Sequence, residues 1–162
     1  MPNQPTDPTP LTHRPRGDWR EGVLAGNIGY LIAQANVAST RQFNAHIGEP
    51  LALRPVEYSL LMLLRANASL TPGQLARALV LPAPSLTMVI DRLQQRGLVE
   101  RVRSETDRRS QRVLLTADGA TLARDAEQRS PAMHAEMDAA LTPGERLLFT
   151  ELLRKVVEHG RR

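Results

Sequence analysis

Hydrophobic residues recur at intervals of three and four along most of the chain, which is the spacing of amphipathic helices. The first stripe consists of Leu24, Ile28, Leu31, Ala35 and Ala38, with Ile32 beside it. Asp18, with Glu21 three residues later, is a start signal, and Gly48-Glu49-Pro50 is a stop signal. The pattern predicts a helix from Asp18 to about Ala45, whose alanine end permits close approach by another helix.

A second helix is predicted to begin at Pro55 and to end near Ala66-Asn67-Ala68. Its inward positions are Val56, Ser59, Leu60, Leu63 and Leu64. Arg54 precedes the helix, and an arginine side chain cannot accept a capping hydrogen bond. The start of this helix therefore lacks the usual side-chain cap.

The middle of the chain predicts two short helices separated by a tight break. Thr71-Pro72-Gly73-Gln74 combines an N-cap, a proline at the first helical position and a capping box. Leu81-Pro82-Ala83-Pro84 interrupts the pattern, and Gly97 stops the second helix. The apolar positions of the two helices are Leu75, Ala76 and Leu79, then Leu86, Val89, Ile90 and Leu93.

A β-hairpin is predicted directly after these helices. Residues 98–103 alternate apolar and charged side chains, residues 111–115 do so less regularly, and residues 104–110 between them are polar. Two helices followed by a basic hairpin form a winged helix-turn-helix. This unit suits DNA, because a helix fits the major groove and a thin arginine-bearing loop fits the minor groove.

Two further helices are predicted at the C-terminal end. Thr116 caps the first, which carries Leu122, Ala126 and Met133 and which Pro131 either kinks or breaks. Thr142-Pro143-Gly144-Glu145 starts the last helix. Its apolar stripe is broad and comprises Leu147, Leu148, Leu152, Leu153, Val156 and Val157. Either a second copy of the chain covers this stripe, or the stripe packs within the monomer.

The amino-acid composition limits the kinds of ligand and reaction that are open to the chain. The chain has 162 residues and a formal net charge of +4, and 20 of its 21 basic residues are arginine. Arginine matches phosphate and guanine edges better than lysine does, although a GC-rich genome produces the same bias. There is no cysteine, which excludes disulfides, thiolate metal sites and cysteine-based redox sensing.

Three segments together resemble the MarR family of bacterial transcription regulators: Leu93–Arg101, Asp107–Arg109 and Val113–Gly119. The resemblance spans roughly residues 20–160. It implies a mainly helical fold with a small β-hairpin wing and with dimerisation helices at both ends. We expect a flexible N-terminal arm over residues 1–17 and one MarR-like domain over residues 18–162. Within that domain, residues 50–118 form the winged unit, and residues 18–48 and 119–162 form the dimerisation helices.

The N-terminal arm is proline-rich and has few large apolar side chains, since five of the twelve prolines lie in residues 1–17. Two roles are open for its basic residues His13, Arg14 and Arg16. They contact the DNA backbone or a partner subunit, or they belong to an inert tail.

The recognition helix is expected to begin near Ala83. Its outward side chains are Ala83, Pro84, Ser85, Thr87 and Met88, with Arg92 further on. Ser85 and Thr87 can bond bases or phosphates, and Ala83 and Pro84 can press on thymine methyl groups. Many relatives carry a basic residue where Met88 stands. More of the specificity is therefore expected from groove shape and from the wing.

The wing is the stronger electrostatic feature, because residues 91–112 hold seven arginines against four acids. Its predicted DNA-binding residues are Arg101, Arg103, Asp107, Arg108, Arg109 and Arg112. One of Arg108 and Arg109 is expected to enter the minor groove while the other pairs with Asp107; the remaining arginines meet phosphates. The alternative is a solvated surface hairpin.

The resemblance also implies an effector site where the dimer helices meet the DNA-binding lobe. The candidates are Tyr30, Arg41, Tyr58 and Met62, which suit a phenolic acid or its thioester. Alternatively, Tyr30, Tyr58 and Met62 are ordinary core residues, and Arg41 forms a surface ion pair.

Catalysis finds little support, since there is no phosphate-binding glycine loop, nucleophile elbow or H-E-x-x-H motif. The four histidines are scattered singly, so no metal site and no cofactor are expected. No apolar run approaches the ~20 residues that span a bilayer, which predicts a cytoplasmic protein, associated with the nucleoid when bound to DNA.

The sequence therefore predicts a homodimeric repressor that binds a palindromic operator and is released by a small aromatic or anionic effector. The alternative function is a winged-helix protein–protein interaction module without specific DNA binding. The alternative of an enzyme acting on aromatic acids or thioesters is weaker.

Overall fold

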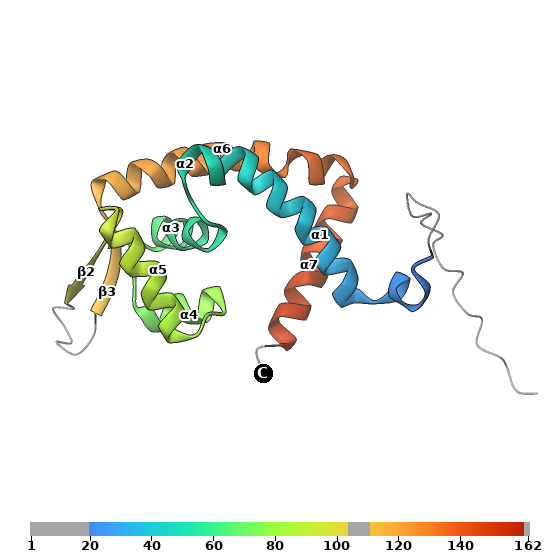
Figure 1. Ribbon diagram of the computed structural model, residues 1–162, viewed down its shortest axis with the longest axis horizontal. Helices are drawn as coiled ribbons and strands as arrows, with labels where there is room; N and C mark the ends of the chain where they lie inside the picture. The colour runs from blue at the N-terminus through green and yellow to red at the C-terminus, as the bar shows by residue number, and fades with distance from the viewer. Residues whose placement is uncertain (1–19, 104–110, 161–162) are drawn as a thin grey trace, which may run out of the picture. The chain divides into compact units, whose positions relative to one another are not determined.

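The computed structural model describes residues 20–103 and 111–160 (Figure 1). Most of these residues are helical, and the strands form one small antiparallel sheet, which confirms the predicted fold class. The helical elements are η1 (Gly22–Gly26), α1 (Ile28–Phe43), η2 (Asn44–Gly48), α2 (Glu49–Leu51), α3 (Pro55–Asn67), α4 (Pro72–Leu79), α5 (Ala83–Gln95), α6 (Ala117–Ala139) and α7 (Pro143–His159). The strands are β1 (Ser69–Leu70), β2 (Val99–Arg103) and β3 (Gln111–Leu115).

The described residues divide into two compact units, the first ending at Asn36 and the second beginning at Val37. In the first unit, the prediction of an unbroken helix from Asp18 is wrong. Gly22 has a φ of 56° and Asn27 is extended, so the 3₁₀ turn η1 is separated from α1. The side chain of Asn27 accepts the Tyr30 N–H at 2.9 Å and thereby caps the start of α1.

The end of the first predicted helix also differs from the expectation. Helical backbone continues from α1 through the π-helical turn η2 and the short helix α2, and it ends where Ala52 adopts φ 50°. Gly48 permits this arrangement, because a Cβ there would lie 2.9 Å from Asn44 Oδ1 and 3.1 Å from the Phe43 ring. The predicted stop at Gly48-Glu49-Pro50 therefore falls inside the helical segment.

The helix α3 begins at Pro55, as predicted, although residue 54 supplies no side-chain cap. The Glu57 carboxylate accepts the Arg54 N–H at 2.8 Å and so fulfils one half of a capping box. Phe43 packs edge-on against Tyr58 with ring centroids 5.7 Å apart, which joins the end of α1 to α3.

The predicted pair of short helices is confirmed as α4 and α5. Thr71 Oγ1 accepts the Gln74 N–H, and the Gln74 side chain accepts the Thr71 N–H, which completes the capping box. Val80 ends α4 in the left-handed region at φ 53°, and the Leu81 N–H donates to Ala76 O. This turn sets the angle at which α5 leaves α4.

The hairpin strands β2 and β3 pair antiparallel, with Arg101 opposite Val113. The two-residue strand β1 adds to the other side of β3, and the sheet order is β1-β3-β2. The sequence pattern did not predict β1, because two residues are too few to show an alternation.

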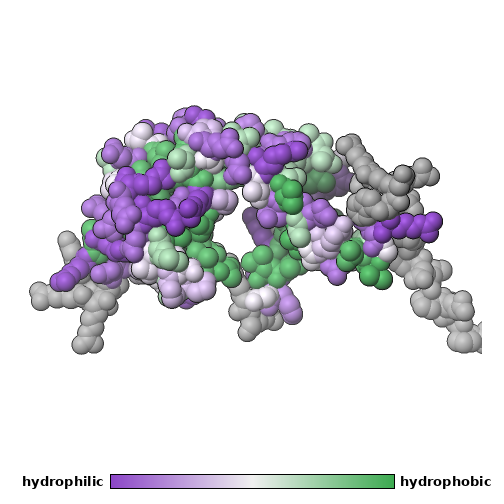
Figure 2. Space-filling model, viewed as in Figure 1, coloured by the Kyte–Doolittle hydropathy of each residue, from purple (hydrophilic) through white to green (hydrophobic). Residues whose placement is uncertain are grey.

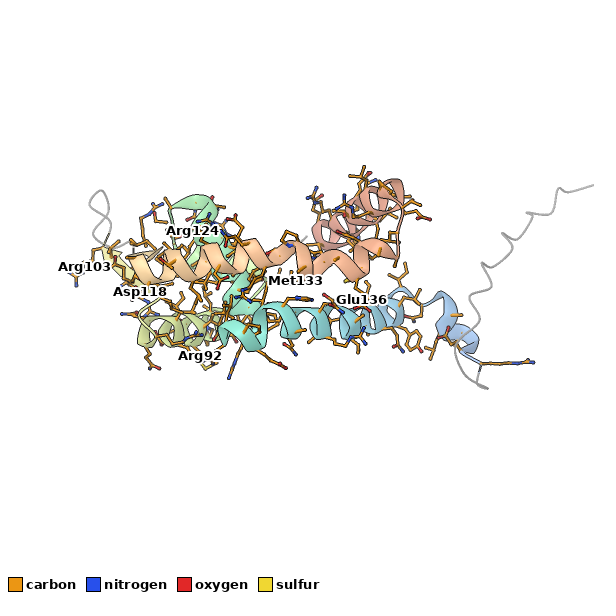
Figure 3. The ribbon with its side chains drawn as sticks, turned by 90° about the horizontal axis from the view of Figure 1, so that it is seen from above. Arg92, Arg103, Asp118, Arg124, Met133 and Glu136 are labelled. Atoms are coloured by element: carbon orange, nitrogen blue, oxygen red, sulfur yellow. The ribbon has the colours of Figure 1, made fainter. Side chains whose placement is uncertain are left out.

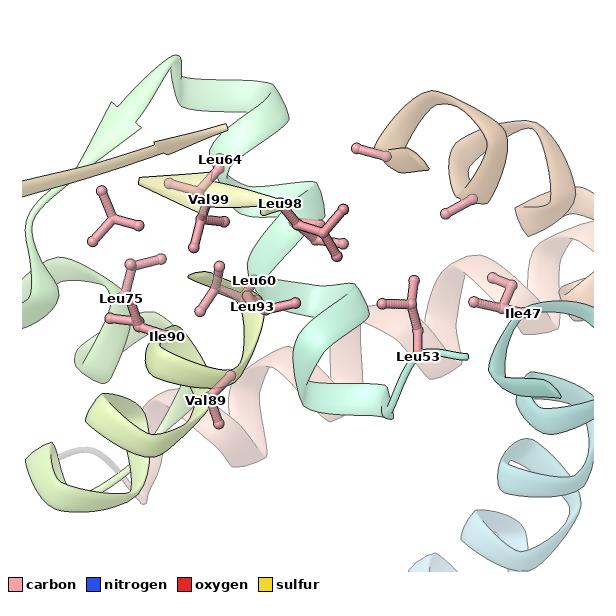
Figure 4. Packing of buried hydrophobic residues seen from close by; sticks show 14 of the residues in the cluster. Ile47, Leu53, Leu60, Leu64, Leu75, Val89, Ile90, Leu93, Leu98 and Val99 are labelled. Carbon is pink, nitrogen blue, oxygen red and sulfur yellow. The ribbon is translucent and has the colours of Figure 1, made fainter. Parts of the chain in front are cut away.

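A core made largely of leucine holds α3, α4, α5 and the sheet together (Figure 4). The side chains of Leu60, Leu64, Leu75, Leu93 and Val113 are at most 1% exposed. Burial of a side chain of this size contributes about 1.5–3 kcal/mol to folding. This shared core makes the helix-turn-helix and the base of the hairpin one packed unit.

The long helix α6 is capped by Thr116, whose Oγ1 accepts the Gly119 N–H at 3.0 Å. A Cβ at Gly119 would lie 1.8 Å from the Leu98 backbone oxygen, so this first turn packs directly on the segment that leads into β2. The helix continues past Pro131, so of the two predicted alternatives, a kink or a break, the break does not occur.

The last helix, α7, has the predicted capping box between Thr142 and Glu145. Hydrogen bonds from the Thr142 backbone and side chain lower the pKa of the Glu145 carboxyl. In contrast to the winged unit, α7 has no buried residue, and its exposed large apolar side chains are Leu147, Leu148, Phe149, Leu152, Val156 and Val157.

Candidate nucleic-acid interface

The outward face of α5 carries most of the side chains that the sequence predicted for DNA reading. Ala83, Pro84, Thr87 and Met88 are exposed, and Ser85 is half-buried. The opposite face, with Leu86, Val89, Ile90 and Leu93, is buried in the core. One face of α5 is therefore fully used in packing, and the other is free to meet a ligand.

Thr87 and Met88 give this face its chemistry. The Thr87 hydroxyl donates to Ala83 O at 3.0 Å, so its oxygen remains available as an acceptor. Met88 is 61% exposed, so much of its side chain is open to a ligand. A thioether and a hydroxyl side by side suit contacts with the mixed polar and methyl edges of a major groove.

Arg92 differs from the other predicted recognition-helix residues. Its Nη1 donates to Glu57 Oε1 at 3.0 Å, and the Glu57 side chain is 2% exposed. The Arg92 side chain, labelled in Figure 3, is 37% exposed. Its guanidinium is therefore engaged with a buried carboxylate of α3 at the surface of the protein.

The arginines at the base of the wing fall into two groups. Arg101 pairs with Asp91 at 2.6 Å and bonds Gln94, which ties β2 to α5. Arg112 donates to the Ser69 hydroxyl at 2.8 Å and to the Ser69 carbonyl, which ties β3 to β1. Both guanidinium groups thus stabilise the hairpin against its neighbours.

Arg103 belongs to the other group. It is exposed at the outer end of β2, where it extends away from the helices (Figure 3). Of the predicted wing residues that the structure describes, it is the one whose position best suits a phosphate contact. Asp107, Arg108 and Arg109 lie outside the described residues.

The four candidate effector residues have ordinary structural surroundings. The Tyr58 hydroxyl shares a hydrogen bond with Ser130 Oγ at 2.7 Å, and Met62 is half-buried one turn further along α3. Arg41 pairs with Glu136 of α6 at 2.8 Å, with both side chains mostly exposed. Tyr30 belongs to the first unit, where its hydroxyl donates to Glu21 at 3.4 Å.

Sequence analysis missed Glu57 and Ser69 as partners of the predicted DNA-contacting arginines. Each partner is more than 30 residues from its arginine, as shown by Arg92 with Glu57 and Arg112 with Ser69. A glutamate at the third position of a helix indicates a capping role, and that signal gave no hint of a second, distant partner.

Across residues 20–103 and 111–160, no group of three or more His, Asp or Glu side chains is arranged to hold a metal ion. No single helix in that part of the chain is long and apolar enough to cross a membrane; one bent pair, α4 with α5, passes by length and composition. Those two helices contribute Leu75 and Ile90 to the core described above.

The surface of α5 and the arginine-rich hairpin beside it define the class: a winged helix-turn-helix of the DNA-binding type. Comparison with known proteins agrees. A sequence profile of the MarR family matches residues 53–110. The multiple antibiotic resistance protein MarR of Escherichia coli is 31% identical over 131 residues, which cover 80% of this chain and 90% of that protein.

Two solved structures extend the comparison. A crystal structure of mutant MarR from E. coli complexed with operator DNA has a TM-score of 0.73 and 32% identity, and the match covers 79% of this chain and 91% of that one. The transcriptional regulator PcaV from Streptomyces coelicolor, in complex with its natural ligand, has a TM-score of 0.77 and 27% identity over 83% and 94% of the two chains. The chain belongs to the MarR family of transcription regulators.

Proposed function

We propose that this protein is a homodimeric repressor that binds a palindromic operator and releases it when a small aromatic or anionic effector binds. The observation that carries the proposal is the exposed face of α5, on which Pro84, Thr87 and Met88 lie opposite a fully buried face. Insertion of this face into a major groove explains why an apolar side chain as large as Met88 remains on the surface.

The proposal assigns sequence reading to α5 and positioning to the wing. Ala83 and Pro84 contact thymine methyl groups, Thr87 and Ser85 bond base edges or phosphates, and Arg103 binds a phosphate. Arg108 and Arg109 keep their predicted places: one enters the minor groove and the other pairs with Asp107. Arg101, Arg112 and Arg92 contribute by holding the unit together.

The proposed dimer follows from the apolar side chains that the described residues leave exposed. In the first unit, Ile28 is 65% and Leu31 is 47% exposed; on α7, Leu147 is 71% and Leu148 is 56% exposed. Hydrophobic side chains appear on the surface of α7 in Figure 2, while the face of the winged unit seen there is mostly hydrophilic. Several exposed large apolar side chains on one element are typical of an association surface. A second copy would cover them and would present two α5 helices about one turn of DNA apart.

The proposed effector binds near Tyr58, Met62 and Arg41, and Tyr30 remains a predicted candidate. A carboxylate could displace Glu136 from Arg41, because that ion pair is mostly exposed and such pairs are weak. An aromatic ring could contact Tyr58 and Met62. The relative PcaV is known in complex with a natural ligand, which supports a ligand-responsive function. Cytoplasmic location follows from the proposed role on DNA.

Fluorescence anisotropy tests the DNA-binding part. Labelled duplexes that tile the DNA upstream of the chain's own operon are titrated at several salt concentrations. We expect one duplex to bind far more tightly than the rest, with a steep salt dependence, because each neutralised phosphate contributes about 0.9 to the slope of log K against log salt. Salt-insensitive binding, or equal affinity for every duplex, would instead favour a protein–protein interaction module.

A pair of threonine variants provides a matched control. Thr87 on α5 and Thr121 on α6 are both exposed, and each donates to the carbonyl four residues earlier at 3.0 Å. Thr87→Ala is expected to weaken binding of the selected duplex, and Thr121→Ala is expected to leave it unchanged. Equal effects of the two variants would contradict the assignment of α5 as the reading helix.

The effector is tested by thermal-shift screening of aromatic acids and their thioesters, followed by addition of the hits to the protein–duplex complex. A compound that raises the melting temperature of the free protein and releases the duplex is expected. Tyr58→Phe, which keeps the ring and removes the hydroxyl, should weaken the response; an unchanged response would move the site elsewhere. Transcription in vitro should fall when the protein is added and recover with the effector.

A further inference from the structure

The side chain of Glu57 is a buried carboxylate at which three segments of the winged unit meet. Its Oε2 accepts the Arg54 N–H at 2.8 Å, and its Oε1 accepts Arg92 Nη1 at 3.0 Å. Arg96 Nη1 lies 3.9 Å from Oε2. The segment before α3, the helix α5 and Arg96 just after α5 are therefore all linked through one side chain.

A carboxylate that is 2% exposed is retained in a folded protein only if it is paired and hydrogen-bonded. Arg92 provides the direct bond, and Arg96 adds a second positive charge. Arg96 also donates to Ala52 O at 2.7 Å and Leu51 O at 3.3 Å, so the end of α5 is fastened to the turn that precedes α3. These bonds constrain α5 both along its axis and around it.

The position of Arg92 on α5 relates this network to the reading face. Arg92 lies four residues after Met88, on neighbouring turns of the same side of the helix. Asp91, the preceding residue, lies about 100° around the helix from Arg92 and pairs with Arg101 of the hairpin at 2.6 Å. The helix is thus held by charge on two flanks, and the flank with Arg92 is held by the buried carboxylate of Glu57.

We propose that Glu57 is a positioning residue for DNA binding, which acts through Arg92 and Arg96 to fix the rotation of α5 and hence the aim of Thr87 and Met88. The inference rests on the proposed DNA-binding function and deepens it. Arg92, which the sequence predicted among the recognition-helix contacts, then contributes to affinity through the placement of α5.

A double-mutant cycle with Glu57→Gln and Arg92→Gln tests this assignment by anisotropy, using the upstream duplex selected above and a random duplex of equal length. Glutamine at 57 still accepts the Arg54 N–H but lacks the charge that holds Arg92. Each single variant is expected to bind the selected duplex about tenfold more weakly, as for residues that share a hydrogen-bond network. Binding of the random duplex and the salt slope should stay unchanged, and the double variant should bind no more weakly than the weaker single variant.

Glu127→Gln is the matched control. Glu127 of α6 pairs with Arg65 of α3 at 2.6 Å, so this variant also removes a glutamate that links α3 to another helix. It should bind the selected duplex like the wild type, measured well below the melting temperature of each variant. If a glutamine variant in the cycle fails to fold, Arg92→Lys, which keeps the charge but loses the planar guanidinium, is expected to show a smaller loss with the same salt slope.

The inference would be overturned if the folded Glu57→Gln variant bound the selected duplex with wild-type affinity. The same result for Arg92→Lys, where it replaces a variant that does not fold, would overturn it too. Either result would leave the proposed function intact. In a second contrary outcome, the losses of the two single variants add in the double variant, and its slope of log K against log salt falls by about one. That outcome would assign Arg92 to a phosphate contact and would also overturn the inference. A wild-type protein that does not distinguish the duplexes would contradict the proposed function, and the inference with it.

Discussion

The winged unit and helix α7 contain the same kinds of apolar residue but bury them very differently. Leu60, Leu75 and Leu93 in the winged unit are fully buried, whereas Leu147 and Leu152 on α7 are 71% and 48% exposed. The core of the winged unit is formed by α3, α4, α5 and the sheet, so its apolar surface is used within one chain. The apolar surface of α7 stays uncovered among the described residues, and the proposed dimer would cover it. Four expected outcomes test this contrast.

The largest effect is expected from the core of the winged unit. Leu93→Ala removes a fully buried side chain between α5 and the core, and such changes cost about 2–5 kcal/mol of unfolding free energy. Chemical denaturation monitored by circular dichroism measures the loss. Met88→Ala, on the exposed face of the same helix, is the control and should cost less than about 0.5 kcal/mol. Equal losses would contradict the two-faced description of α5.

The next effect concerns α7 and association. Leu152→Asp places a charge in the apolar stripe, and a substitution at the centre of an interface costs about 2–4 kcal/mol of binding free energy. Light scattering coupled to size-exclusion chromatography should show conversion of dimer to monomer. Thr150→Asp adds the same charge two positions earlier, on the opposite side of the helix, and should leave the dimer intact. A Leu152→Asp protein that remains dimeric would remove α7 from the interface.

A smaller effect is expected where α6 joins the winged unit. Gly119→Ala would bring a Cβ within 1.8 Å of the Leu98 carbonyl oxygen, and forced repacking of this kind typically costs about 1–3 kcal/mol. Gly144→Ala, in the first turn of α7, meets nothing within 4 Å and is expected to be neutral or slightly stabilising. Thermal unfolding of the two variants compares them directly, and a harmless Gly119→Ala would show that this close packing is not tight.

The smallest effect is a pH dependence at the start of α7. The Glu145 carboxyl has a lowered pKa because the Thr142 backbone and side chain donate to its charged form. A depressed pKa in the folded state adds stability above the unfolded-state pKa, and this stability is lost as the pH falls through the folded-state value. A small loss of helicity is therefore expected in acid, and Glu145→Gln should abolish that dependence. The same acid response in Glu145→Gln would assign it to another carboxyl.

Local signals in the sequence predicted much of this fold. Thr71, Thr116 and Thr142 were each predicted to cap a helix, and in each case the hydroxyl accepts the N–H three residues later. Capping depends on residues within one turn, so the sequence contains the whole interaction. The break before α5 and the hairpin strands were also predicted, because their signals likewise lie in residues close together in the sequence.

The sequence-based predictions failed where two local signals compete or where the interacting residues are far apart in the sequence. Gly22 and Asn27 interrupt the predicted first helix, because the Asn27 side chain caps a later start at Ile28 and helical periodicity alone does not register this. The strand β1 exists only because β3 pairs with it. At the candidate site, the outward face of α5 followed from the 3.6-residue period, but the bond between Arg92 and Glu57 joins residues 35 positions apart.

The central claim is that two copies of the chain present their α5 helices to one symmetric DNA site. Sedimentation velocity of the protein mixed with the selected upstream duplex, with mass determined for the complex, tests it most directly. The account predicts two chains per duplex and much weaker binding when one half of the palindrome is scrambled. A complex with a single chain, or undiminished affinity for the scrambled duplex, would contradict it.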